Sequence, residues 1–279
     1  MANFKLIFLD IDGTLTEPGM NVPPASAQEA VKKAREHGNL IFLSTGRNLG
    51  MLKPVLGSGE YDGVIGSSGG YVSVGGKVIY DDPMDDLDRE RIMTAFNGEG
   101  IFRTLECCEN SFTDESLKEY LEAHSNEGQN SELLRWRRQI ESSLNILPMS
   151  EYRGQRPYKM VLMAMDSERL IKAFDNSGFK DKFKLVLQGE SYGIANAELL
   201  SLSFDKGTAV KKVAEYFNAP LSDTVGYGDS MNDLEMMQVC GLSICMGNGN
   251  DELKKVSDEV CGPVNENGLA ESFKKHGFS

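Results

Sequence analysis

Short apolar runs alternate with stretches of helical period at both ends of this 279-residue chain, and this alternation restricts the fold more than any other feature. Runs of this kind are typical of strands that are buried on both faces of a sheet. Predicted strands occupy residues 4–9, 39–43, 61–65, 199–204, 224–227 and 242–245. Helical stripes at 26–38 and 206–217 lie among them. Strands that alternate with helices predict a parallel sheet covered by helices.

The middle of the chain has a different pattern and is predicted to form a separate α/β domain. Helices are expected at residues 88–96, 116–124, 132–144 and 168–174, and strands at 158–165 and 183–187. The Asp81-Asp82-Pro83 stretch marks a boundary on the way out, and the glycine-containing stretch 189–193 marks the return. We therefore predict a core made of residues 1–82 and 190–279, with residues 83–189 inserted into it.

Charge and composition exclude several classes of protein. The net charge of −13 disfavours nonspecific binding of nucleic acid, which needs a basic face, and disfavours binding to an anionic membrane surface. No apolar run approaches the roughly 20 residues that a membrane span needs, and the N-terminal run is too short for a signal peptide. The five cysteines contain no CxxC spacing, so neither a disulfide framework nor a zinc site is expected. We expect a cytoplasmic protein with reduced thiols.

Polar clusters follow several of the predicted strands, where a parallel sheet places its ligand sites. The first strand ends in Asp10-Ile-Asp-Gly-Thr and the second in Ser44-Thr-Gly-Arg. Lys206 opens the helix after residues 199–204, and Gly228-Asp-Ser-Met-Asn-Asp ends a later strand. Any one of these clusters alone is more typical of a turn or of solvated surface. Their occurrence in order, each at a junction between strand and helix, favours a functional site.

The clusters bring four carboxylates together, from Asp10, Asp12, Asp229 and Asp233. Two unit charges about 4 Å apart repel by about 4 kcal/mol near a protein surface, so a cation is implied. Oxygen ligands with room for water suit Mg²⁺. Lys206 adds a positive charge, and the Thr45 hydroxyl and the Gly46 N–H can donate hydrogen bonds to an anion. A phosphate group fits between these donors and the metal.

Together the four clusters resemble the motifs of the haloacid dehalogenase superfamily, and most closely its Cof-type sugar-phosphate phosphatases. The resemblance covers nearly the whole chain. It implies a Rossmann-like parallel-sheet core with a large α/β cap inserted between the second and third motifs. It also implies a hydrolase that acts on small phosphorylated metabolites with Mg²⁺.

The resemblance assigns a role to each motif residue. Asp10 is the expected nucleophile that forms an aspartyl-phosphate, and Asp12 is the expected general acid and base. Asp10, the backbone carbonyl of Asp12, and Asp229 are the expected metal ligands, with Asp233 in the second shell or acting through water. The phosphoryl oxygens are expected to bind Thr45, Gly46, Lys206, Asn232 and the Ile11 N–H. An Asp two residues after the nucleophile is the phosphatase pattern, whereas the family's transporting ATPases have Thr there.

Three alternatives stay open. A phosphomutase shares the same acidic motifs, and a non-catalytic sensor of a phosphorylated ligand could share the fold. Residues 66–70 also match the G-x-S-x-G pattern of serine hydrolases, with Ser68 as nucleophile and His276 as a partner. Ser68 stands where the Cof-type family usually has Asn. The preferred interpretation is a phosphatase, monomeric or homodimeric, that acts on small phosphorylated metabolites, with sugar phosphates as the favoured class. The sequence identifies neither its substrate nor the cap residues that select it.

Overall fold

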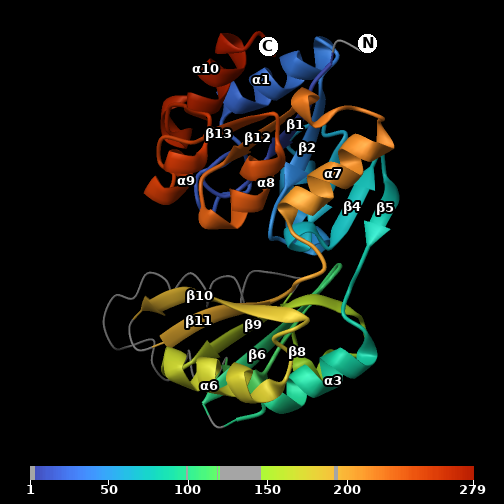
Figure 1. Cartoon of the computed structure of the whole chain (residues 1–279), viewed down its shortest axis with the longest axis vertical. Helices are drawn as coiled ribbons and strands as arrows, with labels where there is room; N and C mark the ends of the chain where they lie inside the picture. The colour runs from blue at the N-terminus through green and yellow to red at the C-terminus, as the bar shows by residue number, and fades with distance from the viewer. Residues whose placement is uncertain (1–3, 99, 118, 120–145, 192–193) are drawn as a thin grey trace. The chain divides into compact units, whose positions relative to one another are not determined.

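The computed structural model describes residues 4–98, 100–117, 119, 146–191 and 194–279. The chain divides into two compact units (Figure 1). The first unit comprises Met1–Arg47, Leu52–Asp82 and Phe204–Ser279, and the second comprises Asn48–Met51 and Pro83–Ser203. The helix predicted at 132–144, and most of the one predicted at 116–124, lie outside the described residues.

An eight-stranded sheet forms the centre of the first unit. In sheet order its strands are β14 (Glu259–Val260), β13 (Leu242–Cys245), β12 (Thr224–Gly228), β1 (Leu6–Leu9), β2 (Leu40–Ser44), β3 (Gly63–Gly66), β4 (Tyr71–Val74) and β5 (Lys77–Asp81). From β14 to β3 neighbouring strands are parallel, and β3, β4 and β5 pair antiparallel. The predicted parallel-sheet α/β fold is therefore confirmed, and β1 lies between β12 and β2.

Helices cover both faces of this sheet. They are α1 (Ala25–Glu36), α2 (Leu49–Leu56, which begins in the second unit), α7 (Lys206–Tyr216), α8 (Leu234–Val239), α9 (Asp251–Val256) and α10 (Gly268–Lys275). Short 3-10 turns are η1 (Ser67–Gly69), η3 (Leu221–Asp223), η4 (Met231–Asp233) and η5 (Val264–Glu266). On β12, Gly226 faces Met236 of α8, whereas the next residue, Tyr227, packs on Phe273 of α10. Because successive strand residues face opposite ways, α8 and α10 lie on opposite faces (Figure 1).

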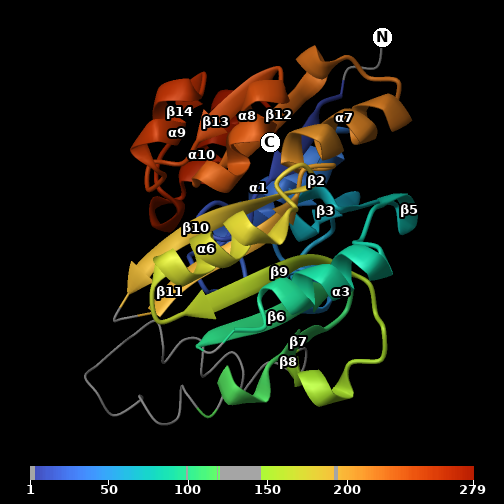
Figure 2. The same ribbon diagram turned by 60° about the horizontal axis from the view of Figure 1, so that its bottom comes forward.

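The second unit has a six-stranded sheet of its own. In sheet order its strands are β10 (Phe183–Ser191), β11 (Ile194–Ser201), β9 (Pro157–Ala164), β6 (Ile101–Cys107), β7 (Ser111–Thr113) and β8 (Ile146–Pro148). A 3-10 turn, η2 (Met149–Glu151), follows β8. One face packs against α3 (Asp86–Ala95) and α6 (Ser167–Ser177), as Figure 2 shows, through a cluster that includes Phe96, Leu162 and Leu170.

Charged side chains lie buried on the strands of this second sheet. The Lys159 side chain is only 6% exposed, and its Nζ lies 2.5 Å from Oε1 of Glu198 and 3.4 Å from Oε2 of Glu106. Burial raises the pKa of Glu106, and the positive charge of Lys159 opposes that rise. Lys159 thus compensates two carboxylates inside the second unit.

Two sequence expectations differ from the structure. The strand predicted at 199–204 is the end of β11, which pairs with β9 and β10 in the second sheet and contributes nothing to the first. Because this long hairpin binds residues 194–201 to the second unit, the chain returns to the first unit after Ser203 and not near residue 190. The hairpin of β4 and β5 was not predicted, although its turn carries the Gly75-Gly76 pair that often marks a hairpin.

The chain leaves the first unit and returns to it beside the same turn, η1. On the way out, the Asp82 N–H donates to the carbonyl of Gly70 at 2.9 Å. On the way back, the backbone of Asp205 passes so close to Gly69 that any side chain at position 69 would collide with it. Gly69 also has φ +107°, which disfavours any other residue there.

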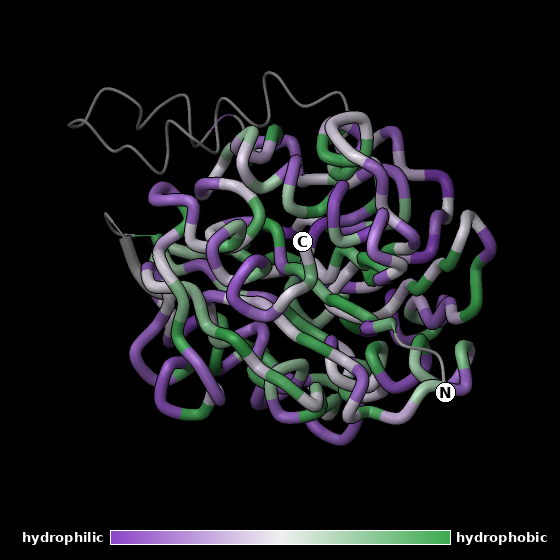
Figure 3. The backbone as a smooth tube through the Cα atoms, turned by 90° about the horizontal axis from the view of Figure 1, so that it is seen from above, coloured by the Kyte–Doolittle hydropathy of each residue, from purple (hydrophilic) through white to green (hydrophobic). Residues whose placement is uncertain are grey.

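None of the described helices is long and apolar enough to cross a membrane. In Figure 3, the apolar stretches are short and are interrupted by polar ones.

Candidate active site

Three neighbouring strands end at one edge of the first sheet and carry the predicted acidic and hydroxyl side chains. Leu9, the last residue of β1, is paired with Tyr227 of β12 and with Leu43 of β2. Asp10 therefore follows β1 next to the ends of the two flanking strands, after which come Asp229 and Thr45. The parallel register gathers residues that are more than 200 positions apart in the chain.

The ammonium group of Lys206 lies at the centre of this edge. It is the first residue of α7, whose N-terminus is capped by the Asp205 carboxylate, which accepts from the Thr208 N–H at 2.6 Å. Its side chain is 1% exposed, and Nζ donates to Oδ1 of Asp10 at 2.7 Å, to Oδ1 of Asp233 at 2.6 Å and to Oδ1 of Asn232 at 3.2 Å. Four residues that the sequence placed in one site are thus in direct contact.

Asp229 completes a cluster of three carboxylates with Asp10 and Asp233. One oxygen from each lies within 4.8 Å of the others. Asp233 is held in place because its Oδ2 accepts from the N–H groups of Asp229 and Ser230, at 3.1 Å each. Asp229 Oδ1 accepts from the Thr14 hydroxyl at 3.3 Å.

The electrostatics of the cluster favour a cation. Burial raises the pKa of Asp10 well above its usual range; Lys206 opposes this rise, and Asp233 and Asp229 add to it. Burial, followed by repulsion from Asp233, raises the pKa of Asp229 to about 7. Burial alone lowers the pKa of Lys206, but Asp10 and Asp233 outweigh burial and raise it. One ammonium faces three carboxylates, so the donor set fits a hard divalent cation that prefers oxygen ligands.

Asp12 is turned toward a residue that the sequence analysis did not single out. Its carboxylate binds the guanidinium of Arg47, with Nε to Oδ2 at 2.8 Å and Nη2 to Oδ1 at 2.6 Å. The Asp12 side chain is 42% exposed, whereas that of Arg47 is 14% exposed. The Ser44-Thr-Gly-Arg motif contains Arg47, but spacing alone does not reveal this pairing.

Thr45, Gly46 and Ile11 lie at the same edge of the sheet. The Thr45 hydroxyl accepts from the Arg47 N–H at 3.1 Å, and the Thr45 N–H donates to the carbonyl of Ile65 at 2.9 Å. Among the described residues, no hydrogen bond joins any of these three to the carboxylate cluster. The structure therefore brings them near the site through topology and leaves their predicted roles to experiment.

A second residue that the sequence analysis missed is Asn248, which follows β13. Its Nδ2 donates to the carbonyl of Gly13 at 2.8 Å, and its Oδ1 accepts from the Val264 N–H at 2.8 Å. The side chain thereby ties the turn after Asp10 to the C-terminal part of the chain. A single Asn in a loop has no periodic signal, so only the fold could show this contact.

The arrangement around Ser68 does not support a serine nucleophile. Ser68 lies in η1, between β3 and β4, whereas the nucleophile elbow needs a turn from a strand into a helix. His276 ends α10, where its ring stacks on Phe278 and its Nε2 lies 3.3 Å from Oε2 of Glu259.

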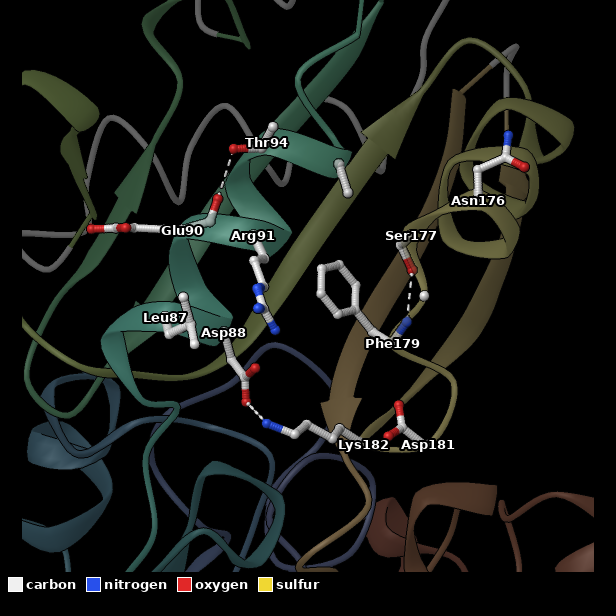
Figure 4. A pocket seen from close by; sticks show the side chains of 12 residues that line it. Leu87, Asp88, Glu90, Arg91, Thr94, Asn176, Ser177, Phe179, Asp181 and Lys182 are labelled. Carbon is white, nitrogen blue, oxygen red and sulfur yellow. Dashed lines mark hydrogen bonds and ion pairs between the residues drawn. The ribbon is translucent and has the colours of Figure 1, made fainter.

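The second unit has a hollow of its own, of about 620 Å³, between α3 and the C-terminal end of α6. Figure 4 shows Asp88 and Lys182 paired there, at 2.7 Å, with Arg91 and Phe179 beside them. The charged residues of this hollow have both signs and come from separate helices and loops. They do not meet at one point, unlike the carboxylates that follow β1 and β12.

Comparison with known proteins identifies the family. The family model of the haloacid dehalogenase-like hydrolases matches residues 7–273, and the chain belongs to this family. It is 28% identical to YkrA of Bacillus subtilis, whose name includes the word phosphatase, over 98% of both chains. It is 27% identical to YwtE of the same species, a 5-amino-6-(5-phospho-D-ribitylamino)uracil phosphatase, over 95% of this chain and 96% of that one.

A solved structure has the same fold. The HAD subclass IIB sugar phosphatase BT4131 matches with a TM-score of 0.75 over 99% of this chain and 100% of that one, at 21% identity.

Proposed function

We propose that this chain is a Mg²⁺-dependent phosphatase that hydrolyses small phosphorylated metabolites, above all sugar phosphates. The observation that carries the proposal is the buried contact of Lys206 with Asp10 and Asp233, next to Asp229. Family membership supports the hydrolase class, and relatives named as phosphatases support the reaction.

The metal is proposed to bind the side chains of Asp10 and Asp229 and the backbone carbonyl of Asp12. Bound there, Mg²⁺ neutralises charge on the phosphoryl oxygens and on the carboxylates. Asp233 is proposed to stay outside the direct ligand set, because its two oxygens already accept hydrogen bonds from Lys206 and from two backbone N–H groups.

The reaction proceeds in two steps on the side chains of Asp10 and Asp12. A carboxylate oxygen of Asp10 attacks phosphorus, the bond from phosphorus to the leaving oxygen breaks, and Asp12 gives that oxygen a proton. Asp12 then takes a proton from water, and the water oxygen attacks the aspartyl-phosphate. Inorganic phosphate leaves, and the Asp10 carboxylate is restored.

Phosphoryl oxygens are held by donors around the same sheet edge. Lys206 supplies the positive charge, and Asn232 lies next to it. Thr45 and the N–H groups of Gly46 and Ile11 are proposed to complete the set. Catalysis in this arrangement depends on positioning and charge stabilisation.

A sugar-phosphate substrate is supported by the names of two relatives, since YwtE acts on a phosphoribitylamino compound and BT4131 is called a sugar phosphatase. The five cysteines are free thiols, which agrees with a reducing cytoplasm. A net charge of −13 argues against nucleic-acid partners.

The direct test is phosphate release from a panel of small phosphate monoesters, with Mg²⁺ and with excess EDTA. We expect release that depends on Mg²⁺ and is strongest for sugar phosphates. Release that EDTA leaves unchanged would contradict the metal site. A requirement for a bisphosphate activator, with phosphate returned to the sugar, would favour the phosphomutase.

Gly13 offers a sharper test of the metal site. Gly13 has φ +91°, and a side chain at this position would also collide with the Asp229 carboxylate. We expect Gly13→Ala to displace Asp229 and to lower Mg²⁺ affinity or activity by about 10–100-fold, as changes beside metal ligands do. The measurement is the Mg²⁺ dependence of phosphate release.

Gly38 provides the matched control for that test. It follows α1 with φ +89°, and a Cβ added there would meet no atom within 4 Å. Gly38→Ala therefore shares the backbone strain of Gly13→Ala without the collision. An equal loss of Mg²⁺ response in both variants would attribute the effect to strain and not to Asp229.

A further inference from the structure

The guanidinium of Arg47 is the main anchor of the Asp12 side chain. It binds both carboxylate oxygens in the forked geometry that gives Arg–carboxylate pairs their directional strength. The remaining hydrogen bond of this carboxylate is a weaker one, from the Gly19 N–H to Oδ1 at 3.3 Å. The side chain is 42% exposed, so packing does not fix its orientation.

Arg47 also binds the segment that follows the Asp12 turn. Its Nη1 donates to Oδ1 of Asn21 at 2.8 Å, and its Nη2 reaches the carbonyl of Met20 at 3.3 Å. Met20 is 57% exposed and Val22 is 58% exposed, so this segment has little packing of its own. One guanidinium therefore holds both Asp12 and residues 19–21.

The backbone under Asp12 is fixed without Arg47. The Gly13 N–H donates to the carbonyl of Thr16 at 2.8 Å, and the Thr16 N–H donates back to the carbonyl of Ile11 at 2.8 Å. Loss of the guanidinium should therefore free the Asp12 side chain and residues 19–21 while the turn itself stays in place.

The contacts also distinguish the two oxygens of Asp12. Oδ1 accepts from Arg47 and from Gly19, whereas Oδ2 accepts from Arg47 alone among the described residues. A carboxylate oxygen has two acceptor positions, so Oδ2 keeps one available. Oδ2 is thus the oxygen that keeps a free acceptor position while the fork is intact.

We propose that Arg47 is a positioning residue that aims Oδ2 of Asp12 at the oxygen of the leaving group. The proposal rests on the proposed function, in which Asp12 gives its proton to that oxygen as the phosphorus–oxygen bond breaks. Arg47 itself gives up no proton; it holds the acid and the segment 19–21 in one arrangement.

A comparison of two substrates distinguishes the positioning of Asp12 from a general loss of activity. A sugar phosphate has a poor leaving group that needs a proton, whereas p-nitrophenyl phosphate releases a stable phenolate without one. The comparison uses kcat/KM, which reports the steps up to departure of the leaving group and leaves out the later step in which Asp12 acts on water. We expect Arg47→Ala to lower kcat/KM for the sugar phosphate by about 10²-fold, a typical cost of misplacing a catalytic group. The loss with p-nitrophenyl phosphate should be several-fold at most. Arg47→Lys keeps the charge but cannot form the fork, so it should resemble Arg47→Ala.

Arg35 supplies the matched control in the same unit. It forms a fork on Asp62, with Nε to Oδ2 at 3.0 Å and Nη2 to Oδ1 at 2.9 Å. Arg35→Ala removes the same kind of ion pair away from Asp12, so its effect on the two substrates should be equal. An equal loss of kcat/KM on both substrates in Arg47→Ala would overturn the positioning role.

Hydrogen exchange tests whether Arg47 anchors residues 19–21, and this measurement does not depend on turnover. In Arg47→Ala, but not in Arg35→Ala, amide exchange in a peptide covering residues 17–24 should become at least several-fold faster. Unchanged exchange would show that Arg47 does not hold this segment and would overturn the proposal. A wild-type chain that releases no phosphate would refute the proposed function instead, and the exchange result would still decide whether Arg47 anchors residues 19–21.

Discussion

Replacement of Asp10 by Asn should reduce phosphate release by a factor on the order of 10⁵, which is a typical cost of removing a nucleophile. The amide oxygen of Asn cannot attack phosphorus as a carboxylate does. The variant should fold, because Asn has nearly the same shape and the change removes one of three clustered negative charges around Lys206. Turnover numbers and thermal unfolding, measured side by side, check both halves of this expectation.

Binding of inorganic phosphate provides the control for Asp10→Asn. Lys206 keeps its contact with Asp233, and Asn232 stays in reach, so phosphate should still bind in the presence of Mg²⁺. Turnover close to that of the wild type would remove Asp10 as the nucleophile. Lost turnover together with lost phosphate binding would point to a damaged site and not to missing chemistry.

Replacement of Lys159 by Met should lower the free energy of unfolding by about 3–5 kcal/mol, the usual cost of breaking a buried ion pair from one side. Lys159 is 4% exposed and Glu106 is 9% exposed, so Glu106 would be left buried with no opposing charge. Urea denaturation followed by circular dichroism measures the change.

An exposed ion pair provides the comparison for Lys159. Lys255 pairs with Glu252 at 2.6 Å, and their side chains are 66% and 67% exposed. Because solvent screens such pairs, Lys255→Met should change stability by no more than about 0.5 kcal/mol. Similar small effects in both variants would mean that the buried cluster in the second unit tolerates an unpaired carboxylate.

The sequence predicted the parallel core sheet and the gathering of its acidic residues because both depend on local signals. Apolar runs that end in Asp10 and Asp229 identify strands and place those carboxylates at one edge of the sheet. The contacts of Lys206 with Asp10 and Asp233 do not follow from this geometry, because the strand predicted before Lys206 lies in the second sheet and α7 carries Lys206 to the site.

Long-range pairing lay beyond the sequence. Residues 199–204 contain four apolar side chains and so resemble a core strand in sequence, and only the pairing of β11 with β9 and β10 assigns their first part to the second sheet. The fork between Arg47 and Asp12 joins residues 35 positions apart, and Asn248 reaches Gly13 across 235 positions. Neither contact has a spacing rule, because side-chain direction is decided by packing after the strands are in place.

The position of Asp82 and Asp205 beside the neighbouring glycines Gly70 and Gly69 has a consequence for how such chains diversify. Asp82 is hydrogen-bonded to Gly70 and Asp205 passes close to Gly69, so the 83–203 excursion begins and ends at nearly one place. A stretch of that kind can lengthen, shorten or be replaced during evolution with little strain on the strands that carry the carboxylates. The excursion can then vary in length and sequence while the strands that carry the carboxylates stay unchanged.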